Sequence, residues 1–158
     1  MTQTITQRSI FGVFNLILRI LLGGMLVLGG IEKFEKPSPS PTKQIELVKS
    51  GELTTENVKV LKIKNYIFGM KQTNYFWQFL GIIEIVFGLL LISQVFGLLG
   101  AIMALPVTIN IFLFHIFLES DEISEIIESA LIFAVNIWLI AYEYKRWKDI
   151  IYSKQIFN

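Results

Sequence analysis

Long apolar stretches alternate with short polar ones along this chain, and four of them are long enough to cross a bilayer as helices. A helix needs about 20 apolar residues to span the hydrocarbon core. The pattern predicts spans at about residues 10–31, 75–92, 95–118 and 126–142. Only Ser93 and Gln94 lie plainly between the second and third spans, which predicts a tight antiparallel hairpin.

The first apolar stretch has a competing interpretation as a cleavable signal peptide with Arg8 as its basic region. The stretch is too long for that, contains Arg19, and ends in Gly29–Lys33 without a small-x-small cleavage site. We therefore interpret it as a retained helix.

The polar segment 32–74 separates the first two spans. Its proline run, residues 36–41, is expected to be extended, because each proline disfavours helix in the residue before it. Residues 42–50 fit a short helix that ends at Gly51, and residues 58–64 fit either an interfacial helix or a short strand. The fold class expected is therefore all-α: an integral membrane four-helix bundle with a long polar loop between its first and second helices.

Composition supports a membrane protein and excludes several kinds of chemistry. The chain has 158 residues, a length typical of one domain, so residues 1–158 are expected to form a single transmembrane domain. A soluble domain of this size has too little interior for 53% hydrophobic residues and a mean hydropathy of +0.58. A net charge of +1 gives no reason to expect a nucleic-acid partner. The absence of cysteine excludes thiolate, iron–sulfur and zinc-thiolate sites, and one histidine excludes a bis-histidine haem. No metal or built-in cofactor is predicted.

Charges flanking the spans predict the orientation. The terminal segments, which fall on one side, are basic, whereas the loop between the third and fourth spans is acidic. This favours both termini in the cytoplasm. The segment 32–74 argues the other way, with eight lysines against five glutamates, but long polar segments count less in this rule. The flanking residues are Arg8, Lys145, Arg146, Lys148 and Lys154 near the termini, and Glu119, Asp121, Glu122, Glu125 and Glu128 near the acidic loop.

Charged residues inside the predicted spans are the most informative, because a charge at a helix centre costs about 2.5–3.5 kcal/mol on insertion scales. Arg19 lies about 13 Å from the inner end of the first span at 1.5 Å per residue. Glu84 lies about 17 Å above the same boundary in the antiparallel second span. We therefore expect an Arg19–Glu84 ion pair.

The other polar residues fall on stripes that helical periodicity defines. Small residues let membrane helices approach closely, so the stripe of the first span that holds Gly23 and Gly30 is expected to face Gly81 and Gly88 of the second. Asn110 and Asn136 fall at comparable depths, in the outer half of the bundle. His115, about 140° around the helix from Asn110 at 100° per residue, is expected on a helix–helix seam near the surface. Lys33 is expected at the outer mouth of the bundle.

Each of these residues also has a structural interpretation. A buried Arg–Glu pair is often a device for folding and register. A lone interfacial histidine is more often hydrogen-bonded than a ligand, and Lys33 fits an anchor at a helix end. The 13 phenylalanines are packing and lipid-facing material first, and a quinone-stacking surface second.

Several runs along the first three spans are similar to a known family. They are Leu18–Ile20 with Gly29–Phe34, Gly81–Ile85 with Gly88–Leu91, and Leu105–His115. In these runs the chain resembles the DoxX family over most of its length, with the long first loop matched least. The resemblance implies a small four-helix protein of the bacterial inner membrane. Some relatives are subunits of a thiosulfate–quinone oxidoreductase, and others are linked to membrane oxidoreductase complexes in redox stress. The family has no agreed catalytic residues, so Arg19, Glu84, Asn110 and His115 transfer only as shared pattern positions.

The leading functional hypothesis is an accessory, non-catalytic subunit of a membrane redox system that binds a lipophilic ligand, for which quinone is the best candidate. Its partners would be the lipid bilayer and a membrane or peripheral oxidoreductase subunit. A proton-coupled carrier that titrates Glu84 is one alternative, and a structural assembly partner without ligand is another. The candidate ligand-binding residues are Arg19, Glu84, Asn110, Asn136, His115 and Lys33.

Overall fold

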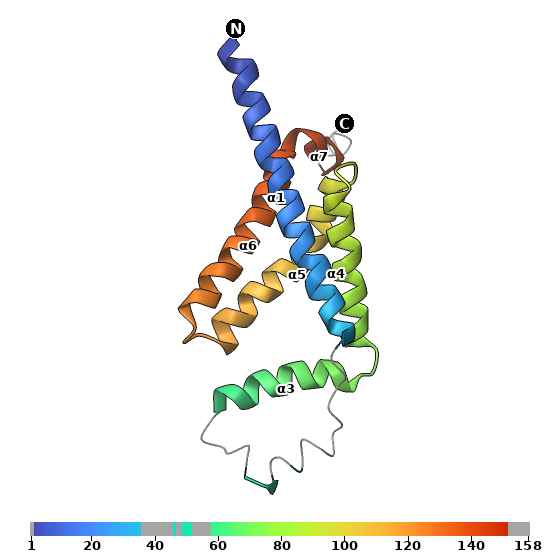
Figure 1. Cartoon of the computed structure of the whole chain (residues 1–158), viewed down its shortest axis with the longest axis vertical. Coiled ribbons are helices and arrows are strands. Elements are labelled where there is room, and N and C mark those ends of the chain that lie inside the picture. The colour runs from blue at the N-terminus through green and yellow to red at the C-terminus, as the bar shows by residue number, and fades with distance from the viewer. Residues whose placement is uncertain (1, 36–45, 47–48, 52–57, 152–158) are drawn as a thin grey trace, which may run out of the picture.

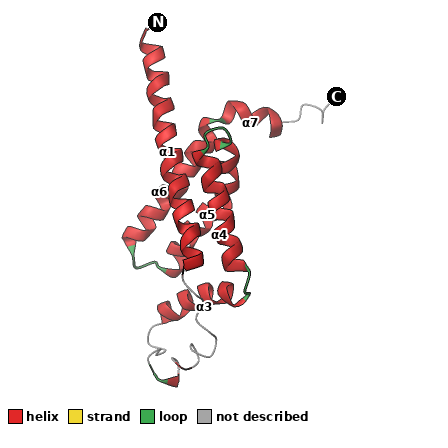
Figure 2. Cartoon of the chain, turned by 45° about the vertical axis from the view of Figure 1, so that its right-hand side comes forward, coloured by secondary structure: helices red, strands yellow, loops and turns green. Residues whose placement is uncertain are grey.

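The computed structural model describes residues 2–35, 46, 49–51 and 58–151, and every element in these ranges is a helix (Figures 1 and 2). The all-α prediction is therefore confirmed. The elements are α1 (Thr2–Glu35), α3 (Val58–Gln72), α4 (Phe76–Ile92), α5 (Gly97–Leu118), α6 (Ile123–Tyr142) and α7 (Tyr144–Ile151).

Three of these helices are long and apolar enough to cross a membrane by themselves. They are the Ile10–Glu35 part of α1, the whole of α5 and the whole of α6. The 17 residues of α4 form a fourth candidate, joined through a bend of 95° to the Asn65–Gln72 part of α3. The chain is thus a helical protein with three to four candidate membrane spans.

Each of the four long helices packs along the long helix next to it in the chain. α1 lies along α4, α4 along α5, and α5 along α6. The start of α1, the α4–α5 turn and α7 lie at one end, which we call the α7 end (Figure 1). The end of α1, the α5–α6 turn and α3 lie at the other, the α3 end, where α3 runs across the axes of the long helices (Figures 1 and 2). The buried apolar core is made of Leu22, Leu26, Leu91, Ala101, Ala104, Val107 and Leu139.

Glycines set the close approach of α1 and α4, as their stripes predict. A Cβ atom added to Gly23 would lie 2.7 Å from the carbonyl oxygen of Gly88, and one added to Gly30 would lie 2.6 Å from that of Gly81. The converse additions would give 2.5 Å at Gly88 and 2.8 Å at Gly81. Real Cβ contacts are essentially never shorter than 3.0 Å. Both glycine pairs therefore require backbone contact, which fixes the register of the two helices.

Asn136 ties α6 to α5 one turn before Pro106. Its side chain is fully buried. Of the two orientations of its amide, one satisfies every neighbour: Nδ2 donates to the Ala101 carbonyl (2.9 Å), while Oδ1 accepts from Thr108 Oγ1 (2.9 Å) and the Leu105 N–H (3.2 Å). Proline removes one helical donor and disturbs the preceding turn. Asn136 therefore supplies partners to the backbone of α5, and the helix continues through Pro106.

The segment between the first two predicted spans contains more helix than predicted. α1 continues to Glu35, and the stretch 58–64, which fitted a helix or a strand, is helical as part of α3. Within the short helix predicted over 42–50, Glu46 and Lys49 are helical, and the following Gly51 has φ +75°. The rest of that helix and the proline run 36–41 lie outside the described residues.

Candidate functional site

A pocket of about 380 Å³ lies between α3, α4 and α5. Most of its wall is aromatic, aliphatic or methionine side chain, and its polar side chains are Tyr66, Glu84 and Asn110. Pockets for small molecules in proteins have volumes of roughly 300–1,000 Å³ and combine apolar walls with a few polar groups. The pocket has the size and the lining expected for a small amphipathic molecule.

The wall that α3 contributes is held by a hydrogen bond across the pocket. Tyr66 donates its hydroxyl to Asn110 Oδ1 of α5 at 3.0 Å, and its ring lies 5.6 Å from that of Phe114, measured between centroids. The Asn110 Nδ2 group makes no hydrogen bond to the described residues. The pocket therefore presents at least one amide donor that a ligand acceptor can use.

Glu84 is paired with Lys33, so the predicted Arg19–Glu84 pair is wrong. Lys33 Nζ lies 2.5 Å from Glu84 Oε2 and 3.2 Å from the Gly29 carbonyl oxygen. Glu84 is only 4% exposed. A buried carboxylate needs a charged or hydrogen-bonding partner, and here the partner comes from the last turn of α1.

Arg19 lies instead at the α7 end. Its Nη2 donates to Glu143 Oε1 at 2.7 Å, and its Nη1 lies 3.4 Å from the carbonyl oxygen of Gln94 in the α4–α5 turn. Gly97 makes room for the guanidinium, since a Cβ there would lie 2.7 Å from Nη1. The depth estimate failed because it started α1 at residue 10, level with the end of α4. The glycine register shifts α1 along α4, so Arg19 is level with the turn.

The remaining candidates lie apart from the pocket. Asn136 is used in the contact with α5 described above. His115 is on the last turn of α5, half-buried as a seam residue near the surface would be, with Nδ1 2.7 Å from Glu119 Oε2. Of the six candidate residues, the structure places Glu84 and Asn110 on the pocket wall and Lys33 against Glu84. Arg19, His115 and Asn136 do not line it.

The two pocket residues that α3 supplies, Tyr66 and Met70, were not among the candidates. They lie in α3, beyond the part of the polar segment that the sequence marked as helix or strand. The apolar run Tyr66–Met70, which lies four residues before the predicted second span, is the sequence signal that could have identified them. As for metals, no group of three or more His, Cys, Asp or Glu side chains gathers in the part of the chain that the structure describes.

Several helices of this length and apolar composition indicate a multi-pass membrane protein. The DoxX family model matches residues 14–116, more than half of the chain, from α1 to near the end of α5. The chain therefore belongs to the DoxX family, as the resemblance predicted. No curated protein and no solved structure matches it.

Proposed function

We propose that this DoxX protein is an accessory subunit of a membrane redox system that binds a quinone or a similar lipophilic molecule between α3, α4 and α5. The observation that supports the proposal most directly is the 380 Å³ apolar pocket, on whose wall the Nδ2 group of Asn110 has no partner among the described residues. A quinone is an apolar ring with carbonyl acceptors, and it needs a donor inside an apolar cleft. Asn110 Nδ2 offers that donor, and the Tyr66 hydroxyl offers another if its bond to Asn110 opens.

The alternative of a proton-coupled carrier has less support. Such a carrier needs a carboxylate that exchanges protons during the cycle, and Glu84 is the candidate in the pocket wall. Its ion pair with Lys33 at 2.5 Å favours a structural role instead, because the pair joins α1 to α4. Flux of protons in liposomes driven by a pH difference would favour the carrier after all.

Substitution of two asparagines tests the binding proposal, because Asn110 lines the pocket and Asn136 does not. Asn110→Leu removes the pocket donor and is expected to weaken quinone binding several-fold, since a hydrogen bond contributes about 0.5–1.5 kcal/mol. Asn136→Leu leaves buried groups of α5 without partners and is expected to lower stability by roughly 0.6–1.7 kcal/mol without weakening binding. Binding of a short-chain quinone to purified protein, compared at equal folded fraction, separates the two effects. Undetectable binding by the wild type at lipid-like concentrations would leave the assembly role as the better explanation.

We further propose that α4 crosses the membrane, which makes a four-helix bundle of the bacterial inner membrane with both termini in the cytoplasm. The start of α1 and α7 lie at the same end, as an even number of spans requires (Figure 1). The basic residues of α7 favour that end as the cytoplasmic one.

The chain has no natural cysteine, so single cysteines report its topology directly. Ser124 and Lys145 are exposed at opposite ends of α6 and its continuation. In intact spheroplasts, Ser124→Cys is expected to react with an impermeant thiol reagent, and Lys145→Cys only after permeabilisation. The reverse pattern would show that the orientation is inverted. Reaction of both cysteines in intact spheroplasts would place them on the same side of the membrane, which contradicts a single crossing by α6.

A further inference from the structure

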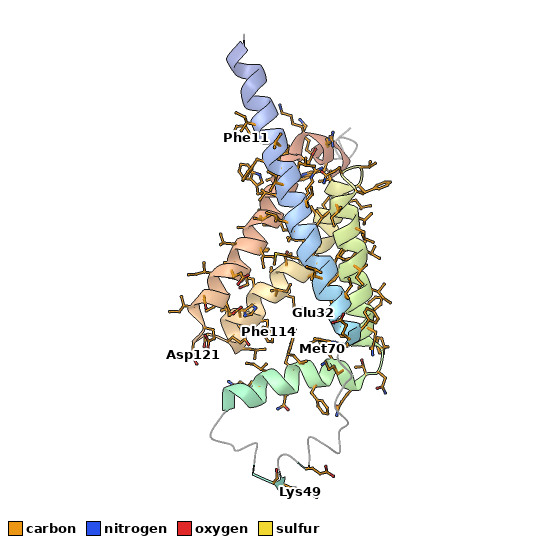
Figure 3. All side chains as sticks on the ribbon, viewed as in Figure 1. Phe11, Glu32, Lys49, Met70, Phe114 and Asp121 are labelled. Carbon is orange, nitrogen blue, oxygen red and sulfur yellow. The ribbon has the colours of Figure 1, made fainter. Side chains whose placement is uncertain are left out.

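A second group of polar side chains lies at the α3 end, outside the pocket, where α1, α3 and α4 meet. Lys33 of α1 and Lys71 of α3 both approach the ring of Trp77 in α4, with Nζ 5.3 Å and 4.8 Å from its centroid. We call these three residues the lysine–tryptophan corner. Figure 3 marks the region by Glu32 of α1 and Met70 of α3.

The charges at this corner are unequally balanced. Lys33 is neutralised by Glu84, whereas Lys71 forms no ion pair with any described residue. In particular, neither carboxylate of the last turn of α1, Glu32 or Glu35, pairs with it. The indole Nε1 of Trp77 is enclosed and also lacks an acceptor among the described residues. Among the described residues, the corner therefore holds more hydrogen-bond donors than acceptors, and the ammonium of Lys71 carries the charge that is not balanced.

The helix that supplies Lys71 is basic throughout. α3 has four lysines and no acidic residue in its 15 positions. It runs across the ends of the long helices, bent by 95° from α4, as a helix at the bilayer surface would (Figures 1 and 2). Basic helices in this position are attracted to anionic headgroups. Tryptophan and lysine together are typical of the headgroup layer.

We propose that the lysine–tryptophan corner binds the phosphate of an anionic phospholipid of the bilayer, of the phosphatidylglycerol type. The phosphate supplies the acceptors and the negative charge that the described residues do not offer Lys71, and the cation–π contact with Trp77 holds the ammonium in place. The charge rule for topology does not explain why the segment 32–74, which is expected outside the cytoplasm, is rich in lysine. Binding of an anionic lipid gives a reason for lysines there. It is separate from the pocket, so it does not depend on quinone binding.

The test is the titration of phosphatidylglycerol into the purified full chain in neutral detergent, with bound lipids counted by native mass spectrometry. Phosphatidylglycerol is expected to bind more tightly than phosphatidylcholine. Lys71→Gln is expected to weaken its binding about fivefold, the factor that corresponds to about 1 kcal/mol per lysine near an anionic surface. Lys71→Arg should retain most of the affinity, because it keeps the charge and the ring contact.

Lys62→Gln is the matched control, since Lys62 is an exposed lysine of the same helix. It is expected to leave the affinity unchanged. Equal losses for Lys62→Gln and Lys71→Gln would overturn the site and indicate diffuse attraction to the whole of α3. Equal affinity for the two lipids, or displacement of phosphatidylglycerol by millimolar inorganic phosphate, would also contradict the proposal. Asn110→Leu should bind phosphatidylglycerol normally, so failure of the quinone proposal and failure of this one are distinguishable.

Discussion

Replacing Glu84 by glutamine is expected to destabilise the protein by about 3–5 kcal/mol, the usual cost of leaving one charge of a buried pair uncompensated. The uncompensated charge is Lys33, whose side chain is 14% exposed and has Glu84 as its ionic partner. Lys33→Met is expected to cost a similar amount, because it leaves the carboxylate of Glu84 alone. Thermal unfolding in a mild detergent, followed by circular dichroism, measures both losses.

The double variant Lys33→Met, Glu84→Gln is expected to recover a large part of the loss, because no charge is left unpaired. Arg19→Met combined with Glu84→Gln is the control, in which the losses should add, since Arg19 is paired with Glu143 at the other end of the helices. Recovery in this second double variant and additivity in the first would show that Glu84 pairs with Arg19 after all.

Gly88→Ala is expected to lower stability by about 1–3 kcal/mol, the range for overpacking a close contact. The added methyl group would lie 2.5 Å from the carbonyl oxygen of Gly23 and 3.0 Å from the backbone nitrogen of Val27. Neither is the end of a flexible side chain, so the helices must separate. Gly88→Leu should prevent the native packing of α1 against α4 altogether. Thermal unfolding in detergent measures the first variant, and the yield of monodisperse protein measures the second.

Gly24→Ala serves as the control for these glycine variants, because a Cβ at Gly24 meets no atom within 4 Å. Alanine is also favoured over glycine inside a helix by roughly 0.5–1 kcal/mol, so this change is expected to be neutral or mildly stabilising. A loss at Gly24 as large as that at Gly88 would mean that glycine matters here for helix flexibility and not for contact.

The periodicity of apolar and small residues correctly predicted the features that depend on a single helix. Apart from the start of α1, which lies at Thr2 and not at residue 10, the long helices begin and end within about four residues of their predicted bounds. The stripes of Gly23 and Gly81 face each other as predicted. Both outcomes follow because apolar length and small side chains are local properties. The pairing of charges depends instead on how far one helix is shifted along another. Lys33 was placed at the outer mouth of the bundle, yet its long side chain reaches the buried carboxylate of Glu84.

The same limit applies to the site. Asn110 and Asn136 lie at comparable depths on successive predicted spans, so the sequence does not distinguish them. In the structure Asn110 lines the pocket, whereas Asn136 forms hydrogen bonds with the backbone of α5 near Pro106. Only the way in which α5 packs between α4 and α6 assigns the two asparagines to different roles. The contribution of α3 to the pocket was missed for a related reason: its residues 66–70 alone do not show that the helix bends back over α4 and α5.

The helices of this molecule differ in apolar length, and hydrophobic mismatch with the bilayer follows from that. The apolar part of α1 has 26 residues, about 39 Å at 1.5 Å per residue, whereas α4 has 17, about 26 Å. A hydrocarbon core is about 30 Å thick. A long helix adapts by tilting, and a short one thins the lipid beside it. If α4 crosses the bilayer, as proposed above, the annulus of lipid around this protein is uneven and is thinnest beside α4. A thicker membrane would then strain the α4 side of the protein first.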